Sequence, residues 1–463
     1  MLNFPICTDF GDRTPNITES KFPTRCLRCA SAKPFTSADM PLESPQHEVA
    51  DGDRAIAESL LRRIAEECPC RAPGSRDEHR AQVILSSQLR RLGGIASWQR
   101  FRFSGSLYLV LGMHFTLAVA ASLLFFVHPI AAAVAHLVLA VSYVADSNRI
   151  AYLLRRLLPK VTASNLLVTF PAQAEVRRRI VISAHADAAP TGWMFQQSGF
   201  AWTDKTPKIL RQLGRPLLIA VIGLCVVAAV EFNAWASGSY FPNFPGAFYG
   251  FTIYFAVLAT LNLQVWWKNE IVPGANDNLS ACAALPVLAK RLTAVQPDDV
   301  ELVFVVTACE EAGTGGALQL AKQMRGEWKS DETDILVLDS IAGGELCLFQ
   351  EGEMIPWRIP NHLQDAVLEV ANREDQTEKL VLFPLPAGAT DAISFLSQGY
   401  SAVCLGRIDR HLGTPRNYHL PSDTPDNIDY DELMGAIDFS EQLVRNLASV
   451  PSEAKAHSNR QRV

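Results

Sequence analysis

The chain lacks two features that would place it in common protein classes. Its ten cysteines form no repeating pattern, and its 42 basic and 48 acidic residues give a formal net charge of −6. Without excess positive charge, nothing favours nucleic acid as a partner. Cys26 and Cys29 have zinc-knuckle spacing, but no second pair stands at a matching distance, so free thiols are expected there. Unpaired cysteines such as Cys282 and Cys309 fit a reducing compartment.

The first residues also lack a targeting signal. Residues 1–48 are rich in Pro, Thr and Ser, and they show neither a sustained period nor a basic start followed by an apolar core. We therefore predict a disordered segment rather than a signal peptide, with Met40 as an alternative start to Met1. The polar tail, residues 451–463, is likewise predicted to be disordered.

Four long apolar runs interrupt the chain. They are Leu107 to Val127, Ile130 to Ala145, Pro216 to Ala236 and Ala247 to Trp267. Only the third contains a charge, Glu231, and the first is long enough to cross a hydrocarbon core of about 30 Å. Buried core helices are the alternative. Because the runs pair closely, we predict two transmembrane hairpins, at residues 107–145 and 216–267.

The basic residues around these runs predict an orientation. Lys and Arg precede the first and third runs and follow the second and fourth, whereas His128–Pro129 and Ser237–Gly246 contain none. The positive-inside rule then places both hairpin tips outside and the remaining segments in the cytoplasm. We expect an integral protein of the cell or inner membrane. Trp266 and Trp267 would anchor at the inner interface, and Glu231 would extend toward the outer one.

The segments outside the hairpins alternate short apolar strands with helical patterns. Strands are predicted at residues 165–170, 179–183, 302–306 and 335–338, each short and rich in β-branched residues. This alternation is typical of an α/β protein with helices packed on a sheet. We expect one such domain, formed by residues 49–105, 146–214 and 268–450.

Several of these strands end in residues that can bind metal. The strand that ends near Val306 leads into Glu310 and Glu311 and then a Gly-rich turn. Ligand sites in α/β folds lie where strands end and helices begin. Two adjacent carboxylates there repel each other unless a cation or a shared proton intervenes.

Further candidates occupy similar places. Asp187 follows His185 by two residues in an extended segment, so its carboxylate can orient the imidazole. Asp277 precedes a helix, where a role as N-cap is the alternative. The full set of candidates is His185, Asp187, Asp277, Glu310, Glu311, Asp339 and His419. Imidazole and carboxylate ligands without cysteine suit a catalytic zinc-type site, and two metals would need a bridging carboxylate.

These motifs, in this order, resemble the co-catalytic di-zinc aminopeptidases, metallopeptidase family M28, which also has carboxypeptidase-like and glutaminyl-cyclase-like branches. The resemblance covers residues 51–447, interrupted by the hairpins. It implies a mixed β-sheet flanked by helices, the α/β/α sandwich of zinc aminopeptidases. The matching segments are Arg71–Ser75, His185–Asp187, Gly274–Asn278, Cys309–Gly313, Leu338–Asp339 and Tyr418–Asp429.

The resemblance also implies roles for these residues and two Zn²⁺ per chain. Asp277 would bridge the metals, with His185 on one and His419 on the other. Glu311 and Asp339 would each complete one metal, in an order left open. Glu310 would be the general base, and Asp187 would orient His185. Thr390–Asp391 resembles a Ser-Asp-His element of the substrate pocket, with Ala392 in place of the His.

The function implied is a membrane-bound aminopeptidase that acts on peptides with a free amino terminus. One alternative is another reaction on the same scaffold, such as amine cyclisation or hydrolysis of a non-peptide amide. The other is a non-enzymatic membrane scaffold, which would be expected to lose ligands that this chain keeps. The expected partners are a peptide substrate and the lipid bilayer, and the membrane is hypothesised to limit access to the site.

Overall fold

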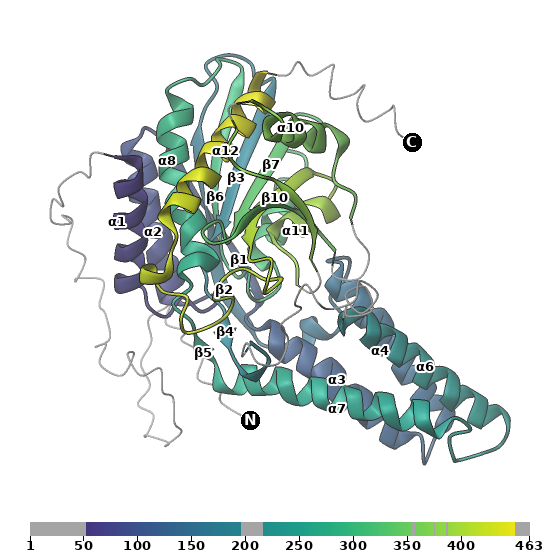
Figure 1. Ribbon diagram of the computed structural model, residues 1–463. Coiled ribbons are helices and arrows are strands. Elements are labelled where there is room, and N and C mark those ends of the chain that lie inside the picture. The colour runs from purple at the N-terminus through teal and green to yellow at the C-terminus, as the bar shows by residue number, and fades with distance from the viewer. Residues whose placement is uncertain (1–51, 196–215, 353–356, 375, 386–387, 450–463) are drawn as a thin grey trace, which may run out of the picture.

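The computed structural model describes residues 52–195, 216–352, 357–374, 376–385 and 388–449. An α/β domain carries a helical arm that projects from one end (Figure 1). The predictions of disorder for residues 1–48 and 451–463, and those for Cys26 and Cys29, lie outside the described residues.

An eight-stranded mixed sheet forms the centre of the α/β domain. Its order is β1-β2-β6-β3-β7-β10-β8-β9. The strands are β1 (Ile95–Ser104), β2 (Lys160–Phe170), β3 (Arg178–His185), β6 (Val300–Thr307), β7 (Thr333–Asp339), β8 (Glu345–Gln350), β9 (Val381–Pro384) and β10 (Ser401–Ile408). The central strands β6, β3, β7 and β10 are parallel, while β2 and β8 flank them in the antiparallel sense. The predicted mixed sheet is confirmed.

Helices cover both faces of this sheet. On one face, even-numbered core residues such as Ile182 and Phe304 pack against α1 (Asp53–Glu67), α2 (Arg76–Arg91), α8 (Ala281–Thr293), α10 (Asn361–Ala371) and α12 (Tyr430–Ser449). On the other, Val181 and Val305 pack against α9 (Gly315–Gln323) and α11 (Asp391–Ser397). Alternate residues of an extended strand point to opposite faces, so strands buried on both sides are apolar throughout.

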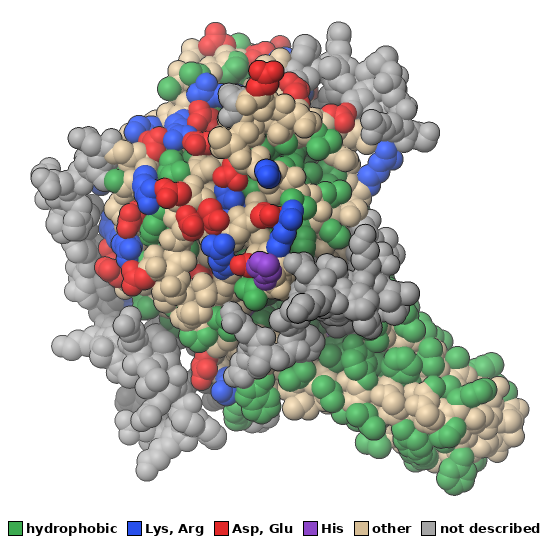
Figure 2. Space-filling model, viewed as in Figure 1, with side chains coloured by type: hydrophobic (Ala, Val, Ile, Leu, Met, Phe, Trp, Pro, Cys, Tyr) green, Lys and Arg blue, Asp and Glu red, His purple; other side chains and the backbone are tan. Residues whose placement is uncertain are grey.

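The arm is a bundle of four apolar helices. They are α3 (Leu107–Leu124), α4 (Pro129–Ser147), α6 (Pro216–Ala236) and α7 (Pro245–Lys268). Each is long and apolar enough to cross a membrane, and their bounds lie close to those predicted. Phe115, Tyr143, Leu224 and Phe255 pack in the centre of the bundle. Figure 2 shows that the outer surface of the arm is largely hydrophobic, which suits contact with lipid.

Both hairpins connect to the same edge of the sheet. Ser104 at the end of β1 pairs with Lys160 at the start of β2, and the first hairpin lies between them. The second hairpin leaves after β3 and returns through β5 (Glu270–Ile271), which pairs with β4 (Pro190–Thr191). Since β1 and β6 are each antiparallel to β2, this edge is also where β3, β6 and β7 end.

Glu231 does not extend to the outer interface, so that prediction is wrong. Its side chain is fully buried between helices, and its Oε2 lies 2.9 Å from Nδ1 of His136 on α4. His136 on a neighbouring helix thus pairs with one oxygen of the carboxylate inside the bundle, where an acid with no partner would be costly.

Candidate metal centre

The carboxyl edge of the sheet brings the predicted site residues together. His185 and Asp339 are the last residues of β3 and β7. Glu310 and Glu311 lie in the turn between β6 and α9, and Asp277 lies in the short helical turn η4 (Ala275–Ser280). His419 comes from the loop that precedes α12 and has a left-handed backbone, with φ of 53°. All are buried or nearly so.

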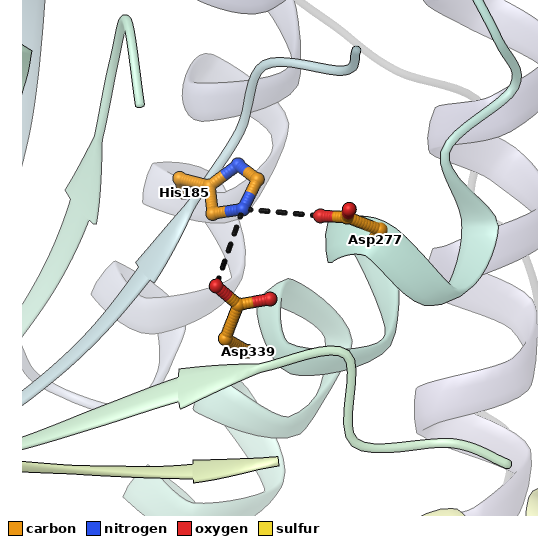
Figure 3. A group of neighbouring side chains, drawn as sticks. All are labelled: His185, Asp277 and Asp339. Atoms are coloured by element: carbon orange, nitrogen blue, oxygen red, sulfur yellow. Dashed lines mark ion pairs between the residues drawn. The ribbon is translucent and has the colours of Figure 1, made fainter. Parts of the chain in front are cut away.

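Asp277 lies between the two histidines. Its Oδ1 is 3.3 Å from Nε2 of His185, and its Oδ2 is 3.5 Å from Nε2 of His419. The residue at the N-cap position of α8 is Ser280, so the alternative role for Asp277 does not apply. Figure 3 shows the carboxylates of Asp277 and Asp339 directed toward the same ring nitrogen of His185. One carboxylate thus presents a different oxygen to each imidazole.

The remaining acids divide between the histidines. Asp339 Oδ2 lies 4.0 Å from His185 Nε2, and Glu311 Oε2 lies 3.5 Å from His419 Nε2. His185, Asp277 and Asp339 offer donor atoms within 4.8 Å of one another, and so do Asp277, Glu311 and His419. His185, Glu310 and Glu311 form a third such group, which overlaps the others. The geometry therefore pairs Asp339 with His185 and Glu311 with His419.

Burial shapes the electrostatics of this cluster. Burial raises the pKa of Glu310 and of Glu311 well above the usual range, and it raises the pKa of Asp339 to about 7. Burial alone would also raise the pKa of Asp277, but hydrogen bonds from His185 and His419 lower it. Carboxylates crowded in this way disfavour their own charged forms unless a cation is bound.

The donor atoms fit such a cation. Glu311 Oε1 is buried and has no hydrogen-bond partner among the described residues, so it is free to bind a metal. Two imidazoles and three carboxylates, without a thiolate, form the donor set expected of a catalytic zinc-type centre. The residues present are therefore a suitable set for the metals that the sequence predicts.

Asp187 supports the site through the backbone. Its carboxylate accepts the N–H groups of Glu310 at 3.1 Å and of Glu311 at 2.9 Å. His185 Nδ1 lies 3.2 Å from the carbonyl oxygen of Asp187 and 3.5 Å from its Oδ1. Asp187 thus holds the imidazole of His185 and also the turn between β6 and α9 (the catalytic turn, residues 308–314).

Arg71 is a positioning residue that the motif analysis did not single out. Its fully buried guanidinium donates to the carbonyl oxygens of Ala186 at 3.0 Å, of Pro273 at 2.7 Å and of Gly274 at 3.0 Å. These contacts join the loop after β3 to the loop that carries Asp277. The available signal for Arg71 was its place in the segment Arg71–Ser75, one of those that resemble the family.

Two further carboxylates hold the ligand loops. Asp423 accepts the N–H groups of Asn276 at 2.7 Å and of Asp277 at 3.1 Å. Glu78 Oε1 accepts the N–H of Cys309 at 2.8 Å, next to Glu310. No local pattern distinguishes such acids from surface ones, because their partners are distant in the sequence.

The membrane hairpins also contact the site. Tyr108, the second residue of α3, places its hydroxyl 3.4 Å from Nδ1 of His419. Phe195, in the turn η3 (Trp193–Phe195) after β4, has its ring centroid 4.6 Å from that of His419. The hypothesis that the membrane limits access to the site named neither Tyr108 nor Phe195.

The end of α4 is joined to the catalytic turn by arginines. Arg155 donates to the Asp146 carboxylate at 2.8 and 2.9 Å and to the Ala312 carbonyl oxygen at 2.5 Å. Arg149 Nε donates to Thr314 Oγ1 at 2.9 Å. Because Ala312 and Thr314 lie in the same turn as Glu311, the first hairpin and the catalytic turn form one packed unit.

The segment Thr390–Asp391 lies beside this unit. Asp391 is buried and accepts a hydrogen bond from the hydroxyl of Thr307, the last residue of β6. Thr390 donates through its N–H and hydroxyl to the buried Glu351. Ala392 packs in the hydrophobic core beneath α9 and α11. The segment therefore contacts the sheet end from the α9 face.

Comparison with solved structures defines the class of fold. The glutaminyl cyclase from Fimbriiglobus ruber is 14% identical, with a TM-score of 0.50 over 87% of this chain and 98% of that chain. BSAP, a zinc aminopeptidase from Bacillus subtilis, is 14% identical, with a TM-score of 0.50 over 87% and 96%. At this identity the likeness concerns the fold, which is that of the zinc aminopeptidases.

One family model matches the part of the chain that begins at the end of the second hairpin. The sequence model of Peptidase family M28 matches residues 263–444, a range that contains Asp277, Glu310, Glu311, Asp339 and His419. No curated protein matches the chain at a significant level. Over residues 263–444 the chain is similar to peptidase family M28.

Proposed function

We propose that the protein is a membrane-bound, zinc-dependent aminopeptidase. The observation that carries this proposal is the position of Asp277, whose two oxygens face two different histidines within a buried cluster of carboxylates. Similarity to a peptidase family supports hydrolysis of a peptide bond. The likeness of fold to a zinc aminopeptidase supports the choice of metal and of reaction.

The ligand assignment follows the two groups of donors. His185, Asp277 and Asp339 would hold one Zn²⁺, and Asp277, Glu311 and His419 would hold the second. When bound, the ions polarise the scissile carbonyl and make a water molecule more acidic. Asp277 would thus be shared by both ions, and each ion would have its own imidazole.

Glu310 is the proposed general base. It lies beside the ligands, with its Oε2 4.0 Å from His185 Nε2, but it is not needed to complete either group. Its carboxylate would take a proton from the attacking water and return it to the leaving amine. Burial raises the pKa of this carboxyl, which makes it a better proton acceptor. Asp187 holds the Glu310 backbone in place.

The bilayer is the second proposed partner. The four helices of the arm would span it, with the peptidase domain on the cytoplasmic side because the basic residues lie at that end of the hairpins. Trp267 is exposed at the end of α7, where an interfacial side chain is expected.

Metal content and turnover test the proposal together. The purified protein should contain close to two zinc ions per chain and should hydrolyse some members of an aminoacyl-arylamide panel. Glu310→Gln should lose turnover by about 10²–10⁴-fold and keep its metal. Glu327→Gln, at an exposed acid outside the site, is the matched control and should behave like the wild type. Protein without metal would contradict the enzyme proposal.

Cyclisation of amino-terminal glutamine is the second candidate. One observation favours it: Ala392 stands where the family's aminopeptidase-like Ser-Asp-His element has a histidine, so the pocket for the substrate amino group differs. A panel of peptides with amino-terminal glutamine distinguishes the two reactions, because cyclisation releases ammonia and leaves the peptide bond intact. Metal-loaded protein that acts only on these peptides would replace the aminopeptidase proposal.

A further inference from the structure

We propose that the site accepts the amino terminus of a peptide that is anchored in the same bilayer. This inference rests on the proposed function and adds a substrate class to it. It is carried by where the hairpins join the domain, by which residues they contribute to the site, and by how firmly they are tied to it.

The depth of the site relative to the bilayer follows from Tyr108. This residue lies in the first turn of α3, and its hydroxyl is 3.4 Å from the ring of His419. The 18 residues of α3 extend over about 27 Å, close to the hydrocarbon thickness of about 30 Å, so the helix has little length to spare. The first turn of α3, and with it His419, therefore lies at the membrane boundary.

The second hairpin also contributes to the surroundings of His419. The N–H of Trp193 donates to Gln264 Oε1 of α7 at 2.9 Å, which attaches η3 to the end of that helix. From η3, the Phe195 ring approaches Tyr108 at 6.0 Å and His419 at 4.6 Å between centroids. An aromatic wall held by both hairpins thus borders the metal ligands. Of these rings that of Tyr108 is amphipathic, a kind favoured at membrane interfaces.

The hairpins are built into the site rather than attached to it by a linker. Arg155 connects Asp146 of α4 to Ala312, and Arg149 connects the end of α4 to Thr314. A simple anchor could join the domain at any edge. Here all four membrane helices end at the carboxyl edge, where the ligands converge (Figure 1).

The opposite edge of the sheet is suited to water. It carries exposed or half-exposed ion pairs such as Arg177 with Asp299 and Lys329 with Glu332. Figure 2 shows charged side chains over the domain and few over the arm. A strand of eight residues covers about 26 Å, so a site at that edge would lie at least this far from the bilayer.

Linker length provides the test. The full-length protein is placed in nanodiscs with peptides coupled through their carboxyl ends to a phospholipid headgroup. The free amino terminus is separated from the headgroup by about 3 residues, reaching about 10 Å, or by about 20 residues, reaching about 66 Å. Initial release of the first residue is measured for both and for the same peptide without an anchor. Both anchored peptides are equally concentrated on the membrane. The ratio of their initial rates therefore reports whether the short linker lets the amino terminus reach the site.

We expect the short-linker peptide to be cleaved at least half as fast as the long-linker one. Cleavage of the long linker alone, or of the free peptide alone, would overturn the inference while leaving the aminopeptidase proposal intact. If no peptide is cleaved by metal-loaded protein, the proposed function fails and the inference fails with it. Glu310→Gln in the same nanodiscs is the control for contaminating activity.

Discussion

The carboxyl edge of the sheet and the membrane bundle both bury charged side chains, but they do so differently. In the bundle each acid faces a base: Glu231 lies 2.9 Å from His136, and Asp146 lies 2.8 Å from Arg155. At the sheet edge several acids share two histidines.

The difference shows how to separate structure from function among buried charges. A one-to-one pair offsets its own desolvation and can be explained by packing alone. An excess of carboxylates in a buried site has no such explanation, because burial without a cation favours their neutral forms. The sheet edge is therefore the part of the molecule whose charges call for a ligand.

Removing the shared carboxylate should have the largest effect. In Asp277→Asn an amide nitrogen replaces one of the two bridging oxygens, and the negative charge shared by both metals is lost, so we expect most of the metal to be lost and activity to fall to background. Asp339→Asn should lose about one equivalent, because only the group around His185 contains Asp339. Metal analysis after dialysis measures both. Equal losses in the two variants would contradict the assignment of Asp277 as the bridge.

Loosening the joint between the two regions should have the next largest effect. Arg155→Lys keeps the charge but loses the planar group that contacts Asp146 and Ala312 together. Displacement of the catalytic turn by about 1 Å is expected to lower kcat by about 10²-fold. The matched control is Arg156→Lys in the same turn, where the side chain is exposed and kcat should not change. Unchanged kcat in Arg155→Lys would show that the bundle does not position the turn.

A smaller effect is expected from Tyr108→Phe, which removes one hydroxyl beside His419. Partners of a metal-bound histidine commonly contribute about 10–100-fold to metal affinity, and a contact as long as 3.4 Å should contribute near the lower limit. Zinc titration with a competing chelator measures this. Tyr249→Phe is the control, since that ring is exposed on α7. Equal zinc affinity in both variants would contradict a contribution of the Tyr108 hydroxyl to metal binding.

The smallest effect on activity is expected within the bundle. Glu231→Ala removes the partner of His136 and should destabilise the protein by about 1–3 kcal/mol while leaving kcat within twofold. Thermal unfolding in detergent measures the stability. The double variant with His136→Ala should show a coupling between the two changes, because the contact is already absent after the first. Loss of turnover in Glu231→Ala would contradict a purely structural role for this pair and would indicate that the bundle affects catalysis.

Much of the fold could be predicted because its signals are local. Length and composition were enough to predict α3, α4, α6 and α7. The strands could be predicted from short β-branched runs that precede helical patterns. Site residues such as His185 and Glu310 could be predicted for the same reason, since each lies at or just after the end of a strand.

Other features depend on contacts between distant segments. Arg71 donates to the carbonyl oxygen of Pro273, 202 residues away, and the segment Arg71–Ser75 by itself does not reveal that partner. The error on Glu231 has the same origin, because its partner His136 belongs to the other hairpin, 95 residues away. The local sequence shows which kinds of group a side chain can bind. It does not show which distant residue will lie beside that side chain in the fold.

The sequence by itself determined the class of this protein: strand ends rich in His and carboxylates, four apolar spans, and basic residues at one end of each hairpin. Only the tertiary structure decided that Asp339 belongs with His185 and Glu311 with His419. It alone placed Tyr108 and Arg155 at the site. The physical reason is that ligand sets and their supports are defined by distances of a few ångströms between strand ends, and sheet order rather than chain order determines those distances.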